Sequence, residues 1–426
     1  MTDYRARVVD TELKRRMRVM GAVLIDGPKA VGKTRTASQV AETVLRLDVD
    51  PVARAALETA PEQLFERPTP ILFDEWQDTP ALWNHVRRAV DDRGEKGLYL
   101  LTGSATPRDT ARMHSGAGRI ARLRMRPMSL FESGHSDGSV SLAALLNGDE
   151  VSGSTNTLTV PQLLERIVIG GWPEITDWDE ADARDWLADY LRNLAEKDVP
   201  DLGTRRNPQN IARLLASLAR AVGTPLNRSE LEVEVGGAGG QIASETLARY
   251  LDALERLMLV EPLPAWRPHM RSRTRLRTTP VHHFVDPSIG TVALGVGTPG
   301  LLADLNAAGF HFESLALRDL RVYSQALGAT LSSWRDTQTN KEVDAVLELP
   351  NGRWAAFEFK LGEAAADRPH VARAGDFRRE ADAARALDAA GHHRLDDGTH
   401  IFLGHRALVL VIARGAAAIG HRLVLQ

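Results

Sequence analysis

Three short apolar runs in the first hundred residues have the pattern of buried strands. Residues 22–25 read Ala-Val-Leu-Ile, residues 71–73 read Ile-Leu-Phe, and residues 98–101 read Leu-Tyr-Leu-Leu. Continuous apolar runs of this length are typical of parallel strands that are covered on both faces. The pattern therefore predicts an α/β sheet in the N-terminal part of the chain.

Helical spacing follows the first of these runs. Apolar residues recur along one predicted helix face at Ala37, Val40, Ala41, Val44 and Leu45. This spacing predicts a helix that begins shortly after the first strand and continues to about residue 45.

The middle of the chain alternates between polar and helical segments. Residues 134–161 are rich in Gly, Ser, Asp, Asn and Thr, which predicts an exposed insertion or linker. Helical periodicity resumes at residues 163–168 and continues in two further stripes, at residues 211–218 and 247–257, with a strand predicted to begin at Val260.

The segment 208–262 resembles a winged helix, because a helix–turn–helix pattern is followed by a strand. Its last predicted helix mixes charges of both signs, with Arg249 and Arg256 beside Glu245 and Glu255. That helix face is not strongly basic. A helical packing or oligomerisation module is the alternative interpretation.

Composition narrows the functional classes. The chain has 426 residues, enough for two to four domains, and a net charge of −3, which gives no global signal for nucleic acid. The absence of Cys excludes disulfides, thiolate chemistry and a cysteine zinc site. The first residues lack the apolar core of a signal peptide, and no apolar run is long enough to span a bilayer. We expect a cytoplasmic protein with no membrane partner.

A phosphate-binding motif joins the first predicted strand to the helix after it. Residues 27–34 read G-x-x-x-x-G-K-T, in which backbone N–H groups surround phosphates. Lys33 is expected to reach the β- and γ-phosphates, and Thr34 to supply an oxygen to Mg²⁺. The sequence therefore predicts ATP and Mg²⁺ as cofactors. The expected nucleotide-binding residues are Gly27, Pro28, Lys29, Ala30, Val31, Gly32, Lys33, Thr34 and Arg35.

Polar residues end the next two apolar runs. Asp74 and Glu75 follow residues 71–73, and such acids at the carboxyl edge of a parallel strand would hold Mg²⁺ and polarise the attacking water, respectively. Ser104 or Thr102 could sense the γ-phosphate. Arg119 could be an arginine finger given to the nucleotide of a neighbouring subunit, or a solvated arginine.

Together these motifs resemble an AAA-type P-loop ATPase of a bacterial and archaeal group that carries an uncharacterised C-terminal domain. The order is the P-loop, D-E, T-G-S and then G-R-I at residues 118–120. Further likeness lies in the P-x-S-x-x-E segment at 127–132, in G-G-W-P-E at 170–174, and in a helix ending in Lys197-Asp198. The resemblance implies nucleotide binding, and it says little about the cellular role. Relatives often have Arg in place of Lys29.

The most basic stretch lies just beyond the winged-helix-like segment. It has no acid, and its arginines are Arg267, Arg271, Arg273, Arg275 and Arg277. Alternating arginines put charge on one side of an extended segment, which favours phosphate contacts with DNA. A solvated loop paired with acids elsewhere is the alternative.

The C-terminal part resembles the PD-(D/E)xK nuclease core. Residues 342–349 predict a strand that contains Asp344, and a turn at 350–352 leads to a strand containing Glu358 and Lys360. The predicted hairpin brings Asp344 beside Glu358 and Lys360, so that the carboxylates bind Mg²⁺ and the lysine activates water. Glu313 could be the helical acid that such cores often supply. Such folds also serve as inert binding modules.

The predicted fold class is therefore a multi-domain α/β protein. It has a P-loop AAA-type parallel sheet, a helical or winged-helix middle, and a restriction-endonuclease-like α/β C-terminal domain. The expected boundaries are 1–133, 134–207, 208–280 and 281–426. We expect an ATP-hydrolysing homo-oligomer that acts on DNA, such as branched or single-stranded DNA. A nucleotide-dependent switch or a DNA-binding regulator with an inactive nuclease-like domain is the alternative.

Overall fold

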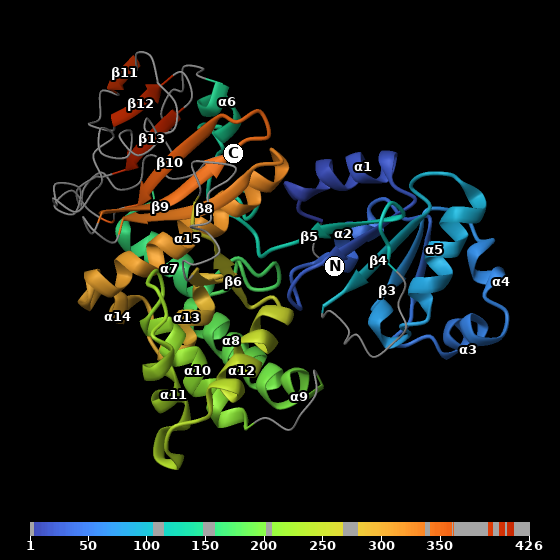
Figure 1. Cartoon of the computed structure of the whole chain (residues 1–426), viewed down its shortest axis with the longest axis horizontal. Helices are drawn as coiled ribbons and strands as arrows, with labels where there is room; N and C mark the ends of the chain where they lie inside the picture. Colours follow the sequence, from blue (N-terminus) through green and yellow to red (C-terminus); the bar gives the residue numbers. More distant parts are fainter. Residues whose placement is uncertain are drawn as a thin grey trace.

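The computed structural model describes most of the chain as three groups of elements (Figure 1). An N-terminal α/β group, a helical middle and a C-terminal sheet follow one another along the sequence. The described residues are 4–104, 115–147, 158–201, 207–266, 280–336, 341–359, 361, 391–394, 400–404 and 407–412.

The N-terminal group is a five-stranded sheet with the strand order β2-β3-β4-β1-β5 and parallel pairing throughout. This confirms the parallel α/β sheet predicted from the apolar runs. The group consists of α1 (Val9–Val19), β1 (Ala22–Asp26), α2 (Lys33–Ser38), β2 (Thr43–Arg46), α3 (Pro51–Thr59), α4 (Glu62–Phe65), β3 (Ile71–Asp74), a 3-10 turn (Trp76–Asp78), α5 (Leu82–Arg93), β4 (Tyr99–Gly103) and β5 (Ile120–Arg124).

The helix predicted to run to residue 45 is wrong in its length. Helix α2 ends at Ser38, and residues 43–46 form the edge strand β2 against β3. Only Leu45 of β2 is buried, while Val44 is 41% exposed, so the apolar spacing that suggested one helix face belongs to two elements.

The helical middle shares a core with one face of the N-terminal sheet. Its helices are α6 (Leu142–Asn147), α7 (Val160–Ile169), α8 (Glu180–Asn193), a π-helix (Leu194–Asp198), α9 (Val199–Asp201), α10 (Pro208–Arg220), α11 (Arg228–Gly236), a 3-10 turn (Gly237–Gly239), α12 (Ser244–Arg256), α13 (Pro287–Leu294) and α14 (Thr298–Ala303). A continuous apolar core joins β1 and β5, through Val23 and Leu123, to α8, α10 and α13, through Leu187, Leu214 and Ile289. The N-terminal group and the middle thus share one core.

The polar segment 134–161 is only partly the exposed linker that its composition predicts. Within it, Leu142, Leu145 and Leu146 of α6 are buried in the core that also contains α7 and α15. Three leucines at helical spacing therefore outweigh the surrounding polar composition.

Helices α10, α11 and α12 are followed by β6 (Val260–Leu263) and β7 (Val281–Phe284), which pair antiparallel. The strand predicted at Val260 is confirmed. The five arginines of the basic stretch belong to the connection between β6 and β7 and lie outside the described residues. The winged-helix interpretation stays a prediction.

The C-terminal group is a mixed sheet with the strand order β11-β12-β13-β10-β9-β8, in which only the β10–β13 pair is parallel. The hairpin predicted over 342–360 is confirmed as β9 and β10. Helix α15 lies between this sheet and the middle helices (Figure 1). The elements are α15 (Leu305–Ala326), β8 (Thr330–Asp336), β9 (Lys341–Glu348), β10 (Trp354–Phe359), β11 (Gly391–Arg394), β12 (His400–Gly404) and β13 (Ala407–Ile412).

Among the described residues, none of the helices combines the length and the apolar character needed to cross a membrane.

Candidate nucleotide-binding site

The loop from β1 to α2 has the backbone that its glycines predict. Gly32 has φ +93° at the start of α2, a conformation that side chains with a Cβ rarely adopt. A Cβ on Gly27 would lie 2.2 Å from the carbonyl oxygen of Met125. Both glycines are therefore required by the path of the loop, which leaves its backbone open to a ligand.

Lys33 lies at the first position of α2 and is 6% exposed. Its Nζ donates hydrogen bonds to the carbonyl oxygens of Gly27 at 3.0 Å and Pro28 at 2.7 Å, so the ammonium lies inside the loop. Burial lowers the pKa of Lys33 to about 8, against the opposing effect of Glu75 and the neighbouring acids. Phosphate groups in the loop would favour the charged ammonium.

Asp74 lies where β3 ends, beside the P-loop. Its carboxylate accepts hydrogen bonds from the Thr34 hydroxyl at 2.7 Å and from the Thr102 hydroxyl on β4. Parallel pairing explains this convergence, because β3, β4 and β1 end at the same edge of the sheet. The predicted Mg²⁺ ligands Thr34 and Asp74 are thus in direct contact.

These oxygen ligands fit Mg²⁺, which is usually held by one or two protein groups together with substrate phosphates. Within the described part of the chain, no cluster of three or more His, Asp or Glu side chains could hold a metal by itself. The site would therefore bind the ion together with a phosphate ligand.

Glu75 follows Asp74 in a left-handed conformation, with φ +53°. This turn of the backbone directs the chain out of β3, and Gln77 Nε2 donates a hydrogen bond to the Glu75 carboxylate. Sequence reasoning did not identify Gln77. Ser104, which follows β4 and is 3% exposed, lines the same cavity as Glu75.

One cavity of about 1070 Å³ between the N-terminal group and the middle is lined by Lys33, Thr34, Glu75, Gln77 and Ser104. Asp74 does not line it directly and is connected to it through its contact with Thr34. The cavity is lined by the N-terminal residues, the P-loop and the start of α2, Asp48 after β2, the residues that follow β3 and β4, Met128, and residues of the range 173–186. The lining residues are Tyr4, Arg5, Arg7, Lys29, Ala30, Gly32, Lys33, Thr34, Arg35, Thr36, Asp48, Glu75, Gln77, Asp78, Ser104, Met128, Pro173, Glu174, Asp177, Trp178 and Trp186.

Arg119 lies at the opposite edge of the sheet. Its carbonyl accepts a hydrogen bond from the Ala22 N–H at the start of β1, whereas the P-loop follows the end of that strand. The guanidinium is 42% exposed and pairs with Asp91 at 2.8 Å. Arg119 therefore cannot act on the nucleotide of its own chain, and the arginine-finger role stays a prediction.

Arg7 was not identified from the sequence, yet it holds the P-loop and also lines the cavity. It is 6% exposed and donates to the Val31 carbonyl at 2.9 Å, to the Arg126 carbonyl at 2.7 Å and to Glu132 at 3.0 Å. Glu132 is the acid of the P-x-S-x-x-E segment, so one side chain connects that segment to the phosphate loop.

A second link joins the outside of the P-loop to the middle helices. Lys29 Nζ lies 2.6 Å from the carboxylate of Asp198, and the Tyr190 hydroxyl donates to the Lys29 carbonyl at 3.3 Å. Asp198 ends the π-helix that follows α8. The helix motif ending in Lys197-Asp198 thus has a structural role, because its acid holds the P-loop.

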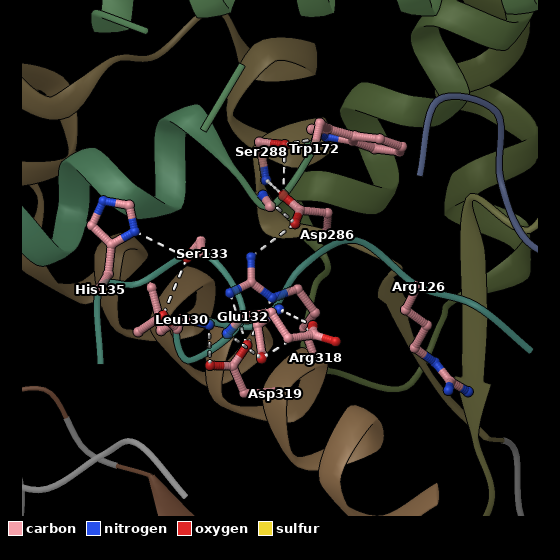
Figure 2. Close-up of polar contacts among 12 residues, drawn as sticks. Arg126, Leu130, Glu132, Ser133, His135, Trp172, Asp286, Ser288, Arg318 and Asp319 are labelled. Atoms are coloured by element: carbon pink, nitrogen blue, oxygen red, sulfur yellow. Dashed lines mark hydrogen bonds and ion pairs between the residues drawn. The ribbon is translucent and has the colours of Figure 1, made fainter. Parts of the chain in front are cut away.

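The P-x-S-x-x-E and G-G-W-P-E segments both contact a buried network around Arg318 of α15 (Figure 2). Arg318 pairs with Asp286 at 2.9 Å and with Asp319 at 2.8 Å, and all three are buried. Asp286 accepts from the Gly171 N–H at 2.9 Å, and Asp319 accepts from the Leu130 N–H at 3.0 Å. Burial alone would lower the pKa of Arg318, but Asp319 and Asp286 raise it above its usual value.

The predicted metal-binding acids of the C-terminal sheet do not come together as a set of three. Asp344 and Glu358 lie on adjacent strands, and Asp344 accepts a hydrogen bond from the Phe359 N–H at 2.6 Å. Glu313 on α15 instead lies 3.8 Å from His283 of β7. Lys360 lies outside the described residues.

Strand alternation separates Glu358 from Glu313. Residues 345, 347 and 357 pack with α15 in one core, whereas Val346 and Ala356 pack on the other face with Trp266 and Trp334. Glu358 alternates with Ala356 and therefore lies on the face away from the helix that carries Glu313. The alternation is interrupted near Asp344, because the pairing of β9 with β8 shifts register and Val343 packs on the same face as Val346.

Comparison with known families assigns the N-terminal group to a class. Residues 20–133 match the family described as an AAA domain. Two families described as domains of unknown function, DUF8612 and DUF4143, match residues 160–300 and 308–388. The parallel sheet, the P-loop and this match together define an AAA-type P-loop ATPase domain. The AAA-type part of the sequence prediction is confirmed.

Two mycobacterial relatives match most of the chain. They are the uncharacterized proteins Mb2031c of Mycobacterium bovis and Rv2008c of Mycobacterium tuberculosis. Each is 27% identical over 357 residues, which cover 82% of this chain and 72% of the relative.

Among solved structures, a RuvB variant of Thermotoga maritima is 16% identical and matches 60% of this chain and 89% of its own, with a TM-score of 0.25. A DNA polymerase III gamma subunit-related protein from the same organism is 12% identical, with 73% and 100% coverage and a TM-score of 0.22. Drosophila ORC bound to DNA is 15% identical, with 68% and 85% coverage and a TM-score of 0.16. At these TM-scores the likeness carries no argument.

Proposed function

We propose that this chain binds ATP with Mg²⁺ and hydrolyses it in the cavity between the P-loop and the G-G-W-P-E turn. The observation that carries the proposal is the convergence of the P-loop lysine, the Thr34–Asp74 contact and Glu75 on that one cavity. Each of these groups has a defined use in phosphoryl transfer to water.

The proposed roles follow from the positions of the side chains. Lys33 binds the β- and γ-phosphates by leaving the carbonyls that it now contacts, and Thr34 and Asp74 hold Mg²⁺. The ion, when bound, neutralises charge on the phosphates. Glu75 orients and deprotonates the attacking water, and Gln77 keeps its carboxylate directed until the substrate is bound.

The substitution Lys33→Ala tests nucleotide binding. It should weaken the binding of ATP and ADP by roughly 100-fold or more, because a charged donor to the phosphates is lost. Lys96→Ala is the matched control, since Lys96 is an exposed lysine outside the cavity. Isothermal titration with each nucleotide measures the change. Wild-type affinity in the Lys33→Ala protein would remove the proposed site.

We further propose that the protein uses ATP hydrolysis to act on DNA. Its support is the basic stretch 267–277, which the sequence places between the paired strands β6 and β7, after three helices. Hydrolysis should then rise in the presence of single-stranded, duplex or branched DNA. Replacing Arg271, Arg273 and Arg275 together by Ala should reduce that stimulation and flatten its salt dependence.

A nucleotide-dependent switch is the second candidate function. The observation that favours it is the attachment of the P-loop to other segments through Lys29–Asp198 and Arg7–Glu132. Slow hydrolysis that is indifferent to every DNA form, with nucleotide still bound, would support the switch and count against the DNA motor.

A further inference from the structure

The cavity extends beyond the region that phosphates would occupy. At one side it is lined by Lys33 and Thr34, and at another by Pro173, Trp178 and Trp186 from residues matched to DUF8612. A triphosphate needs only the P-loop side. The second side presents the flat, apolar surfaces of these three residues, on which a nucleobase can stack, together with the carboxylates of Glu174 and Asp177.

Trp178 differs from the other tryptophan on this wall. The Trp186 ring stacks on Tyr190 at a centroid distance of 5.3 Å and an interplanar angle of 10°, so one of its faces is covered. Trp178 is 38% exposed, and within the described part of the chain no other aromatic ring stacks on it. An exposed indole that lines a cavity offers a face on which a planar ligand can stack.

The turn that carries Trp178 is held firmly. The Trp178 N–H donates to the Ile175 carbonyl at 3.0 Å, and Arg166 donates to the Thr176 carbonyl at 3.0 Å. Arg5 donates to the Thr176 hydroxyl at 3.1 Å and pairs with Asp177. The indole therefore needs little ordering when a ligand binds, which reduces the cost of binding.

The N-terminal segment connects this turn to the P-loop helix. Tyr4, which precedes the Arg5 that holds the turn, lies 3.0 Å from the Thr36 hydroxyl on α2 and donates to Asp10 at 2.7 Å. Thr36 is one helical turn beyond Lys33. The base side and the phosphate side of the cavity thus belong to one connected wall.

We propose that Trp178 is the stacking surface for the base of the bound nucleotide, and that the DUF8612 region supplies the base-binding wall of the cavity. This inference rests on the proposed ATP site. It assigns to residues 173–186 a ligand-binding role that complements the phosphate contacts of the AAA domain.

Inorganic tripolyphosphate separates the two sides of the cavity, because it carries the phosphates of ATP without the base. Titrations of the full chain with Mg²⁺-ATP and with Mg²⁺-tripolyphosphate would be compared for the wild type, Trp178→Ala and Trp178→Phe. Phe310→Ala is the matched control, since Phe310 is also 38% exposed and lies on α15, outside the cavity.

We expect Trp178→Ala to weaken ATP binding about tenfold, a typical loss for one stacked base. Tripolyphosphate affinity should not change, and Trp178→Phe should keep most of the ATP affinity. Phe310→Ala should bind both ligands as the wild type does. Wild-type ATP affinity in Trp178→Ala, or an equal loss of both ligands, would overturn the base-stacking role. If the wild type binds neither ligand, the proposed ATP site fails with it.

Discussion

The acids of the two sheets have different surroundings. Asp74 ends a parallel strand, contacts Thr34 at 2.7 Å, and lies next to Glu75, which faces an open cavity. Asp344 and Glu358 lie on a β-hairpin and are 9% and 4% exposed, and Glu358 shares the face of Ala356, opposite α15. This difference shows which side chains the strand topology alone brings together. Parallel strands bring groups from distant segments to one edge, while a hairpin aligns two strands and leaves a helical third group free to lie elsewhere.

The largest expected effect is on the rate of ATP hydrolysis, which should depend on the acid in the N-terminal sheet and not on the acid in the C-terminal sheet. Glu75→Gln should slow ATP hydrolysis by roughly 100-fold or more, because general-base catalysis is lost while nucleotide binding remains. Glu358→Gln is the counterpart in the other sheet and should leave hydrolysis unchanged. Steady-state phosphate release measures both. Equal rates of ATP hydrolysis for the two variants would show that Glu75 is not the general base.

A related substitution sharpens the view of the C-terminal sheet. If that sheet cleaves DNA with Mg²⁺, Asp344→Ala should abolish cleavage, whereas Glu313→Gln should leave it unchanged, since Glu313 faces His283. A plasmid nicking assay with both variants provides the test. Loss of cleavage in Glu313→Gln would contradict the separation of the three acids.

The next effect is on stability, in the buried network that joins α15 to Asp286, Gly171 and Leu130. Arg318→Ala leaves Asp286 and Asp319 buried without their cation, and we expect a loss of about 3–5 kcal/mol. Arg249→Ala, which breaks an exposed pair with Glu245, should cost less than about 0.5 kcal/mol. Urea unfolding of the two variants gives the comparison. Similar unfolding curves would show that the network contributes little.

A smaller effect concerns the proton on Lys33. Its pKa of about 8 lies below the ordinary lysine value, so burial disfavours the charged form until phosphates arrive. Binding should then take up protons near pH 8, and affinity should fall by up to about tenfold per unit as the pH rises above that value. Titrations in buffers of different ionisation enthalpy measure the uptake. Lys33→Arg, which stays charged, should show none.

The smallest expected effect tests the attachment of the P-loop to the middle helices. Lys29 is 47% exposed, so Asp198→Asn should change stability by less than about 1 kcal/mol. It should still alter ATP affinity by a few-fold, because the P-loop loses its contact with the π-helix. Asp189→Asn breaks an exposed pair with Arg192 on α8 and is the control. Identical affinities in the two variants would rule out the attachment as a determinant of nucleotide binding.

Much of the nucleotide site could be predicted because its chemistry lies in contiguous motifs. Lys33, Thr34, Asp74 and Glu75 each follow an apolar strand, and parallel pairing brings them together wherever those strands form one sheet. Arg7 and Trp178 could not be predicted in this way. Their roles depend on contacts across more than a hundred residues, with Glu132 in one case and the P-loop cavity in the other.

The errors have physical causes of the same kind. A single apolar stripe at 37–45 proved to be a short helix and an edge strand, because hydrogen bonding of residues 43–46 to β3 outweighs helical spacing. The polar segment around α6 contains three leucines that pack against α7 and α15. In both cases tertiary packing decides the local structure, and tertiary packing cannot be predicted from a local sequence pattern.

The position of the N-terminal segment bears on how this protein should be divided for experiments. The match to the AAA domain begins at residue 20 and ends at residue 133. A fragment cut at these limits would lack Arg7, the side chain that supports the P-loop, and also Trp178, on the facing wall of the cavity. The matched AAA domain is therefore smaller than the part of the chain that encloses the cavity, and a fragment limited to residues 20–133 is unsuited to nucleotide screening.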